Sequence, residues 1–555
     1  MQYFCIKLTS GYSPQQRRKK IFILTSMYSN NIKNRIRSVG MLFLALFLTG
    51  TVSSCKDDSA DSDSYKPFDP NLPVMVQAIS PESGSGYEQI IIYGSNFGTN
   101  KENVSLKIGG QQAVVVSVMS DKLYGFIPPR AFSGEIELTI YDDAGQAHTG
   151  TSQVKLNYER QPVVSTLCGY QNDNDTQGEL WGSFDVCTGF NYEGCLAVDP
   201  LNPDKVYIVY DRNDNGFVAE LDLAKREASR LMQASKFQNQ RLRNAAFTND
   251  GQYMLVSADQ GSDRHEAPSV WIVKRNPDGT FNNNSDAQVL AKWQQCNGVA
   301  VHPVNGEVYF NSYEDGQLFR LELDDYFKAM EIDETTGEAK GWTGDKADGC
   351  FRELFQIMDP RYEFQIVIHP SGNYAYLVVI NRNYILRTDY NWQKKEFMTP
   401  YVVAGFNSDI DRGEWVDAVG SNARFKRPYQ GIFVKNPQYE AEGKDDVYDF
   451  YINDCLNFCV RYMTPEGIVR TYAGRAPSTN GNIWGTEDGG LRTAARFRDV
   501  TGLAYDEKRE RFYVLDHNNR RIRTIGQESE DMIIVDGDDE EEGEEGDNEN
   551  SQATE

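Results

Sequence analysis

Three long polar segments of the chain each carry a tryptophan, a residue type suited to binding a sugar. Each tryptophan stands among Asp, Asn and Gly residues and ahead of a phenylalanine. An indole ring stacks on the apolar C–H face of a sugar, while neighbouring carboxylates and amides bond its hydroxyls. The structural alternative is that each ring anchors a long loop on the sheet beneath it. The pairs are Trp181 with Phe184, Trp415 with Phe425, and Trp484 with Phe497.

Six further polar residues recur where the second strand of a repeated unit ends. Repetition alone would place them at one depth, on the same face as the tryptophan segments. Side chains converging there could bind glycan hydroxyls or a cation. The alternative is turn formation, since Asp and Asn bond their own backbone at strand ends. The six residues are Asp211, Asp259, Asn311, Asn381, Asp454 and Asp516.

Two of these carboxylates, Asp454 and Asp516, are the first candidates for catalysis. Paired carboxylates cleave glycosidic bonds as general acid and base, and Arg212, Arg382 or His517 would assist them. However, the sequence has no Ser-His-Asp order of recognisable context, no phosphate loop and no metal-ligand spacing. We therefore predict binding without catalysis, no metal and no cofactor, with a structural cation left open. A glycan lyase or hydrolase is the alternative.

The repeats that position these residues are clearest in residues 495–526. Three short stretches of alternating apolar residues there are separated by turn-forming clusters, a pattern typical of an antiparallel meander. Related strand pairs recur five more times upstream. A small sheet cannot bury both faces alone, so stacked copies are needed. The six units favour a six-bladed β-propeller over residues 161–527.

The last unit resembles the NHL repeat family, whose pattern of Gly-apolar-Ala-x-Asp, Tyr-Val-x-Asp and Asn-x-Arg-Ile it matches almost in full. This unit lacks an evident fourth strand after Ile525. Residues 163–169 look like residues 400–405 and 468–474, which each follow the third strand of a blade. We therefore predict that residues 163–169 complete the last blade, with residues 531–536 as the competing candidate. Either closure removes an exposed strand edge.

Residues 73–159 have a different composition, in which alternating strands are punctuated by Gly and Pro. The pattern indicates an immunoglobulin-like sandwich, and the turn Gly-Ser-Asn-Phe-Gly ending at Gly98 resembles that of an IPT/TIG domain. The predicted fold class is therefore all-β, an IPT/TIG sandwich followed by the propeller. Some relatives of this domain bind DNA, but the net charge of -25 argues against nucleic acid. We expect the domain to be a spacer.

The N-terminal 54 residues resemble a bacterial lipoprotein signal. Basic residues precede the short apolar run 41–48, and Val-Ser-Ser then leads to Cys55, the expected site of lipidation. The acidic tether 55–72 resembles the signal by which Bacteroidota send lipoproteins to the outer face of the outer membrane. The acidic tail 528–555 is expected to be disordered, because like charges repel one another.

The cysteines give no metal motif. No Cys-x-x-Cys pair occurs, and the five histidines are scattered, so a zinc site is not expected. Cys187 could form a disulfide with Cys195 or Cys168, and packed free thiols are an equal alternative.

Together, the anchor, the spacer and the propeller resemble the surface lipoproteins of Bacteroidota glycan-uptake systems. The resemblance implies an outer-membrane protein that binds a polysaccharide or oligosaccharide on the loop face of its propeller. Delivery would be to a TonB-dependent transporter and its glycan-binding lipoprotein. It implies membrane contact only through the lipid anchor and no nucleic-acid partner. The alternatives are a glycan-cleaving propeller and a protein-binding scaffold.

Overall fold

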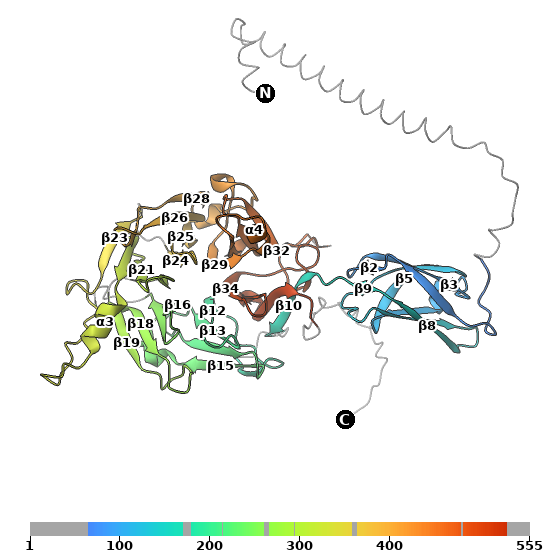
Figure 1. Ribbon diagram of the computed structural model, residues 1–555, viewed down its shortest axis with the longest axis horizontal. Coiled ribbons are helices and arrows are strands. Elements are labelled where there is room, and N and C mark those ends of the chain that lie inside the picture. The colour runs from blue at the N-terminus through green and yellow to red at the C-terminus, as the bar shows by residue number, and fades with distance from the viewer. Residues whose placement is uncertain are drawn as a thin grey trace, which may run out of the picture.

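The computed structural model describes residues 65–169, 179–213, 215–259, 266–292, 295–357, 363–478 and 481–529. Two all-β bodies follow one another: a blue-to-teal sandwich and a ring of sheets running from green to red (Figure 1). The predicted signal region 1–54, Cys55, the tether up to residue 64 and the tail from residue 530 lie outside these ranges. Within the ranges, no helix is long and apolar enough to cross a membrane.

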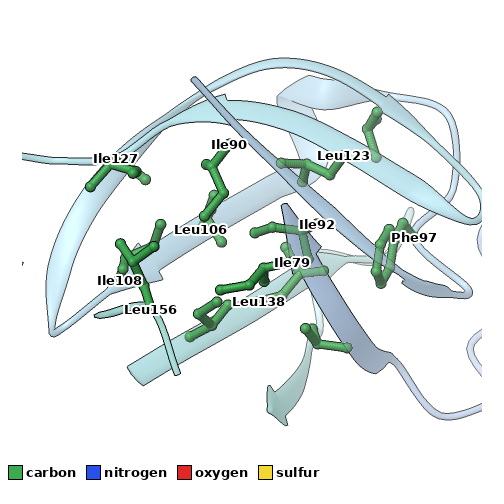
Figure 2. Close-up of a cluster of buried hydrophobic side chains, with 14 of the residues drawn as sticks. Ile79, Ile90, Ile92, Phe97, Leu106, Ile108, Leu123, Ile127, Leu138 and Leu156 are labelled. Atoms are coloured by element: carbon green, nitrogen blue, oxygen red, sulfur yellow. The ribbon is translucent and has the colours of Figure 1, made fainter. Parts of the chain in front are cut away.

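The N-terminal domain is a sandwich of antiparallel strands. Strand β5 pairs with β6 on one side and with β4 on the other, and so connects the two layers. Alternate apolar residues of both layers meet in the core, as Ile92 and Leu123 do with Leu106 and Leu138 (Figure 2). A short parallel pair, β2 (Ser83–Gly84) and β9 (Asn157–Tyr158), closes one end. In spatial order the main strands are β1 (Met75–Ser80), β3 (Gln89–Ser95), β6 (Lys122–Phe126), β5 (Gln111–Met119), β4 (Val104–Ile108), β7 (Glu135–Tyr141) and β8 (Ala147–Lys155).

The glycine-bounded turn of this domain has a structural role. Asn96 and Gly98 adopt left-handed conformations, with φ of 63° and 71°, which Asn and Gly tolerate best. Between them, Phe97 is 1% exposed and packs in the core. The Asn96 amide donates to the carbonyls of Asp69 and Leu72. The turn therefore also fastens the incoming chain to the domain.

The propeller has six blades, as predicted, each with four main antiparallel strands, called A to D from the centre outward. Blades 1 to 3 are β12 (Gly194–Val198), β13 (Lys205–Tyr210), β14 (Val218–Asp222) and β15 (Glu227–Met232); β16 (Leu242–Phe247), β17 (Tyr253–Ala258), β18 (Pro268–Lys274) and β19 (Ala287–Lys292); and β20 (Val299–Val301), β21 (Val308–Ser312), β22 (Gln317–Leu321) and β23 (Arg352–Gln356). Blades 4 and 5 are β24 (Phe364–Ile368), β25 (Tyr374–Val379), β26 (Tyr384–Asn391) and β28 (Tyr401–Gly405); and β29 (Pro428–Lys435), β30 (Tyr448–Asp454), β31 (Cys459–Met463) and β32 (Val469–Gly474). Blade 6 has β34 (Val500–Asp506), β35 (Arg511–Asp516) and β36 (Arg521–Gln527) as strands A to C. Two-residue strands β11 (Gly182–Ser183), β27 (Glu396–Phe397) and β33 (Gly489–Gly490) extend blades 1, 4 and 6.

The ring closes as predicted, because a strand from the start of the propeller becomes strand D of the last blade. Strand β10 (Pro162–Cys168) pairs antiparallel with β36, from Pro162 opposite Gln527 to Cys168 opposite Ile522. In Figure 1 the teal β10 lies beside the orange-red strands of blade 6. The competing segment 531–536 lies outside the described residues.

Strand direction divides the propeller into two faces. The B–C turns and the connections from strand D to the next strand A lie on one face, here called the loop face. The sandwich joins the opposite face, because β10 starts there beside the end of β36. At this junction the Tyr158 hydroxyl donates to Glu528 Oε2 at 2.8 Å. The helices α3 (Leu323–Met330) and α4 (Pro437–Ala441) also lie in turns of that opposite face.

The described cysteines are free thiols, six of them buried. Cys168 and Cys187 pack in one apolar cluster with Phe184 and Phe190. The structure therefore has packed thiols in place of the alternative disulfide between Cys187 and Cys195 or Cys168.

Candidate binding site

Blade 6 contains a buried ionic cluster at one of the predicted site residues. Arg523 contacts Asp516 (Nη1 to Oδ2, 3.0 Å) and Asp488 (Nε to Oδ1, 3.0 Å), and all three side chains are fully buried. Asp516 also accepts the Arg498 N–H and the Asn519 amide. Burial raises the pKa of Asp516 to about 6. The cluster ties the D–A connection to strands B and C.

Blade 5 repeats this arrangement. Arg461 contacts Asp454 (Nη1 to Oδ2, 3.0 Å) and Asp417 (Nη2 to Oδ1, 2.8 Å). Asp454 also accepts the Lys426 N–H and the Asn457 amide. Burial raises the pKa of the Asp454 carboxyl. The two blades therefore share one structural motif, in which an aspartate, an asparagine three residues later and an arginine seven residues later act together.

These clusters correct the interpretation of Asp454 and Asp516 as an acid–base pair. Both carboxylates are 0% exposed, and each is occupied by an arginine, an amide and a backbone N–H. They fasten loops and are not open to a glycan. The suggested assistants lie in other contacts of the loop face: Arg212 over the Tyr192 ring, Arg382 against Asp409, and His517 buried near Glu193, with its pKa lowered by burial.

Asp211 and Asp259 belong to a different cluster, at the centre of the loop face. Arg243 lies between them, with Nε 3.1 Å from Asp211 Oδ2 and Nη1 bonded to Asp259, and it also contacts Glu363. Arg243 is 1% exposed. Burial lowers its pKa, but the surrounding carboxylates, Asp211 foremost, outweigh this effect and raise the pKa. Arg241 completes the pairing of Asp211.

Asn311 and Asn381 serve the backbone. Asn311 Oδ1 accepts the N–H groups of Asn297 and Gly298, both at 2.9 Å, and is buried. Asn381 Oδ1 accepts the Glu363 N–H at 3.1 Å. The six residues therefore do not form one ring at a common depth, because two lie inside blades, two bind Arg243 and two organise loops.

Trp181 anchors its loop. Its ring meets those of Phe190, Tyr210 and Phe217 edge to face, at centroid distances of 6.0, 6.3 and 5.9 Å. Arg230 lies over the ring as well. The structural alternative stated for the three tryptophans therefore describes Trp181.

Trp415 and Trp484 are more open, at 38% and 40% exposed. Trp415 donates from Nε1 to Thr471 Oγ1 at 2.9 Å, and the Arg475 guanidinium lies 4.1 Å from the ring centroid. Arg498 lies 4.9 Å from the Trp484 centroid. Both rings are therefore held on the loop-face connections with part of their surface in solvent.

The three tryptophans are not equivalent, although the shared pattern of Trp, Phe and polar residues suggested it. The N–H groups of Thr188, Arg424 and Arg496 donate to Leu180, Val416 and Glu487, respectively. In the first loop the residue that follows the acceptor is Trp181, whereas in the other two loops it is Asp417 or Asp488. Trp181 therefore occupies the position of these aspartates. Phe184 is not equivalent to Phe425 and Phe497 either. A glycine at the end of strand D packs closely against one phenylalanine in each loop: Gly169 against Phe190, Gly405 against Phe425, and Gly474 against Phe497. Phe190, and not Phe184, is therefore the counterpart of Phe425 and Phe497.

An open groove lies on the loop face between blades 4 and 5. It has a volume of about 470 Å³ and is formed by Arg382 in the blade 4 B–C turn and by the connection 406–424. Phe406 is 57% exposed at its edge, with Arg424 5.2 Å from the ring centroid. The other lining residues are Asn407, Ser408, Asp409, Arg412 and Glu414. An exposed aromatic ring beside several hydrogen-bonding groups can bind a sugar.

Sequence reasoning missed most of this groove. Only Arg382 was named, and in another role, because the remaining lining residues follow no repeat. Two more grooves lie on the sandwich against residues 66–73 and contain no predicted site residue. Among the described residues, no group of three or more His, Cys, Asp or Glu side chains is arranged to hold a metal ion.

Comparison with known proteins shows the family to which the chain belongs. The IPT/TIG domain model matches residues 73–158, and no curated protein matches. An auxiliary nutrient binding protein of Bacteroides thetaiotaomicron VPI-5482 is 37% identical, with a TM-score of 0.69 over 83% of this chain and 100% of that one. The chain belongs to the family of this protein. An auxiliary nutrient binding protein of Bacteroides ovatus ATCC 8483 is a further member, 30% identical with a TM-score of 0.58, over 84% of this chain and 100% of that one.

A third member has a different description. It is a B. thetaiotaomicron VPI-5482 protein provisionally described as a phosphatase, 47% identical, with a TM-score of 0.74 over 84% of this chain and 99% of that one. The matches in this family cover more of the chain than the propeller alone, so the order of sandwich and propeller is common to its members.

Proposed function

We propose that this protein is a cell-surface lipoprotein that captures a polysaccharide or oligosaccharide on the loop face of its propeller. It passes the glycan to an outer-membrane TonB-dependent transporter and its glycan-binding lipoprotein. The names of two family members, auxiliary nutrient binding proteins, support a role in nutrient capture. The groove between blades 4 and 5 is the observation that carries the proposal.

The groove suits a sugar better than the residues predicted from repetition. Phe406 presents an open ring for stacking, and the arginines, carboxylates and amide around it bond hydroxyls in the plane of the sugar. Trp415 follows the lining residue Glu414 and offers a second partly open ring. A glycan that extends from the groove toward blade 5 would meet Trp415, whose ring contacts Thr471 and Arg475 there.

The proposed location rests on the sequence and on the placement of the two bodies. Lipidation of Cys55 would tether the N-terminus to the outer membrane, with the sandwich between the tether and the propeller. Because the sandwich joins the face opposite the groove, the loop face is directed away from its own attachment point. Such an arrangement leaves the groove open to incoming glycans.

The test is affinity electrophoresis of the chain from residue 56 to residue 555 in gels containing plant, host or microbial polysaccharides. Retardation by at least one glycan is expected, with a strong loss in Phe406→Ala and a smaller loss in Trp415→Ala. Trp392→Ala is the matched control, because Trp392 is 46% exposed on the same blade but lies in a C–D turn of the opposite face.

The same samples are assayed for new reducing ends and unsaturated products. Retardation without products, lost in Phe406→Ala and kept in Trp392→Ala, supports capture. Products released by the wild-type protein would replace the proposal with a glycan-cleaving function. Absence of retardation with every glycan of the panel would contradict it.

A further inference from the structure

The groove carries an excess of positive charge. Its charged lining residues are three arginines, Arg382, Arg412 and Arg424, against two carboxylates, Asp409 and Glu414. Arg382 is paired with Asp409, and Arg424 lies 3.7 Å from the exposed Glu414. Within the described part of the chain, Arg412 has no carboxylate within ion-pair distance, and it is exposed. One guanidinium therefore faces the groove uncompensated.

Two further uncompensated arginines flank the exposed ring of Trp415. Arg475 and Arg492 lie 4.1 and 5.9 Å from its centroid. Their hydrogen bonds go to backbone carbonyls, those of Asn457 and Gly474. Over the residues that the structure describes, neither makes an ion pair. Burial lowers the pKa of Arg475, and the charges of Arg492 and Arg461 act in the same direction, while Cys459 and the buried Asp454 oppose the shift.

These arginines differ from three buried arginines of the propeller. Arg243, Arg461 and Arg523 are each enclosed by two or three carboxylates. The whole chain has a formal net charge of -25, so its general surface repels anions. Arg412, Arg475 and Arg492 are therefore local positive charges on the part of the loop face that carries Phe406 and Trp415.

We propose that the captured glycan is anionic, carrying carboxylate or sulfate groups that Arg412, Arg475 and Arg492 bind while Phe406 and Trp415 stack on its rings. This inference rests on the proposed function and names its ligand class. A planar guanidinium donates two parallel hydrogen bonds to a carboxylate or sulfate, which an ammonium group cannot match. Because the groups are partly exposed, the interaction weakens as salt rises.

The test compares ligands that differ only in charge. Binding of the chain from residue 56 to residue 555 is measured by calorimetry with polygalacturonate, carboxyl-reduced polygalacturonate, dextran sulfate and dextran. Arg412→Gln and Arg475→Gln are each expected to weaken anion binding by about tenfold or more, the loss typical of one charge-assisted hydrogen bond. Arg352→Gln is the control, since Arg352 is half exposed and paired with Glu396 at the end of β23 away from the loop face.

The outcomes separate this inference from the proposed function. Binding of polygalacturonate that is lost on carboxyl reduction assigns carboxylate as the recognised group, and tight binding of dextran sulfate alone assigns sulfate. Both require sensitivity to Arg412→Gln and insensitivity to Arg352→Gln. Equal binding of charged and neutral forms would overturn the anionic ligand and leave glycan capture standing. Failure of every glycan in the electrophoresis panel would overturn both.

Discussion

Blades 5 and 1 fix the connection that precedes them by different interactions, ion pairs in blade 5 and aromatic packing in blade 1. In blade 5 the strand-end residue Asp454 bonds Arg461, which reaches Asp417 in the D–A connection. In blade 1 the register places Tyr210 at the strand end, and Trp181 occupies the position of Asp417. An aromatic cluster replaces the ion pairs.

Blade 4 gives a third solution at the strand positions. Val379 and Leu386 stand where blade 5 has Asp454 and Arg461, because Val379 pairs with Tyr384 as Asp454 pairs with Cys459. Both are buried. The comparison teaches that the motif is one means of fixing loops, and that an Asp or Trp in a repeat does not by itself mark a ligand site. A buried ion pair costs desolvation that an apolar pair avoids.

The largest expected effect comes from breaking the ionic cluster. Arg461→Leu leaves Asp454 buried without its cation, and we expect a loss of about 3–5 kcal/mol in the free energy of unfolding. The double variant Asp454→Val/Arg461→Leu copies blade 4 and should lose less than the single variant. Denaturant unfolding followed by tryptophan fluorescence measures both. A double variant less stable than Arg461→Leu would show that the blades are not interchangeable.

A truncation in the aromatic cluster of blade 1 should lower the stability of the protein through lost packing. Trp181→Ala removes a ring in contact with Phe190, Tyr210 and Phe217, and we expect a loss of about 3 kcal/mol. Glycan binding by the folded fraction should be unchanged, because the ring is an anchor. Trp484→Ala is the control and should cost less stability, since Trp484 is 40% exposed. Loss of binding in folded Trp181→Ala would restore Trp181 as a ligand contact.

The architecture was predictable from the sequence because each strand carries its own signal. Alternating apolar residues gave six strand pairs, and residues 163–169 resembled other fourth strands closely enough to predict the closure with β36. These signals are local or repeated. Strand pairing depends on them directly.

The site was less predictable because its contacts join distant residues. Arg461 and Asp417 are 44 positions apart, and Arg382 and Asp409 are 27 apart. Arg243 had a visible signal, a charged residue within the inner strand β16, but its three acidic partners come from separate connections. The shared composition of the loops did not distinguish Trp181 from Trp415, because equivalent positions are defined by backbone hydrogen bonds that the sequence does not show.

The pH dependence of stability should show a smaller effect, expected only for blades 5 and 6, which contain the buried aspartates. Burial raises the pKa of Asp516 from 3.8 to about 6, although Arg523 opposes the shift. The folded state therefore binds more protons between these values, and the contribution of Asp516 to stability falls as pH rises through that window. Asn cannot titrate, so Asp516→Asn should destabilise more at about pH 4.5 than at about pH 7.5, by on the order of 2 kcal/mol.

Denaturant unfolding at the two pH values measures this difference. Trp181→Phe is the control from blade 1 and should give the same loss at both, because the ring contacts of Trp181, with Phe190, Tyr210 and Phe217, involve no carboxyl group. A loss in Asp516→Asn that is equal at both pH values, or larger at the higher one, would contradict the raised pKa.

The smallest effect concerns the arginine of the aromatic cluster. Arg230 lies 4.3 Å from the Phe217 centroid and pairs with Glu179, which keeps Arg212 at 3.6 Å if Arg230 is removed. Arg230→Met should therefore cost about 1 kcal/mol or less, since the cation is partly exposed and its apolar stem is replaced. Arg461→Met, the same substitution in blade 5, should cost several times more. Equal losses would mean that apolar packing, and not charge pairing, dominates both blades.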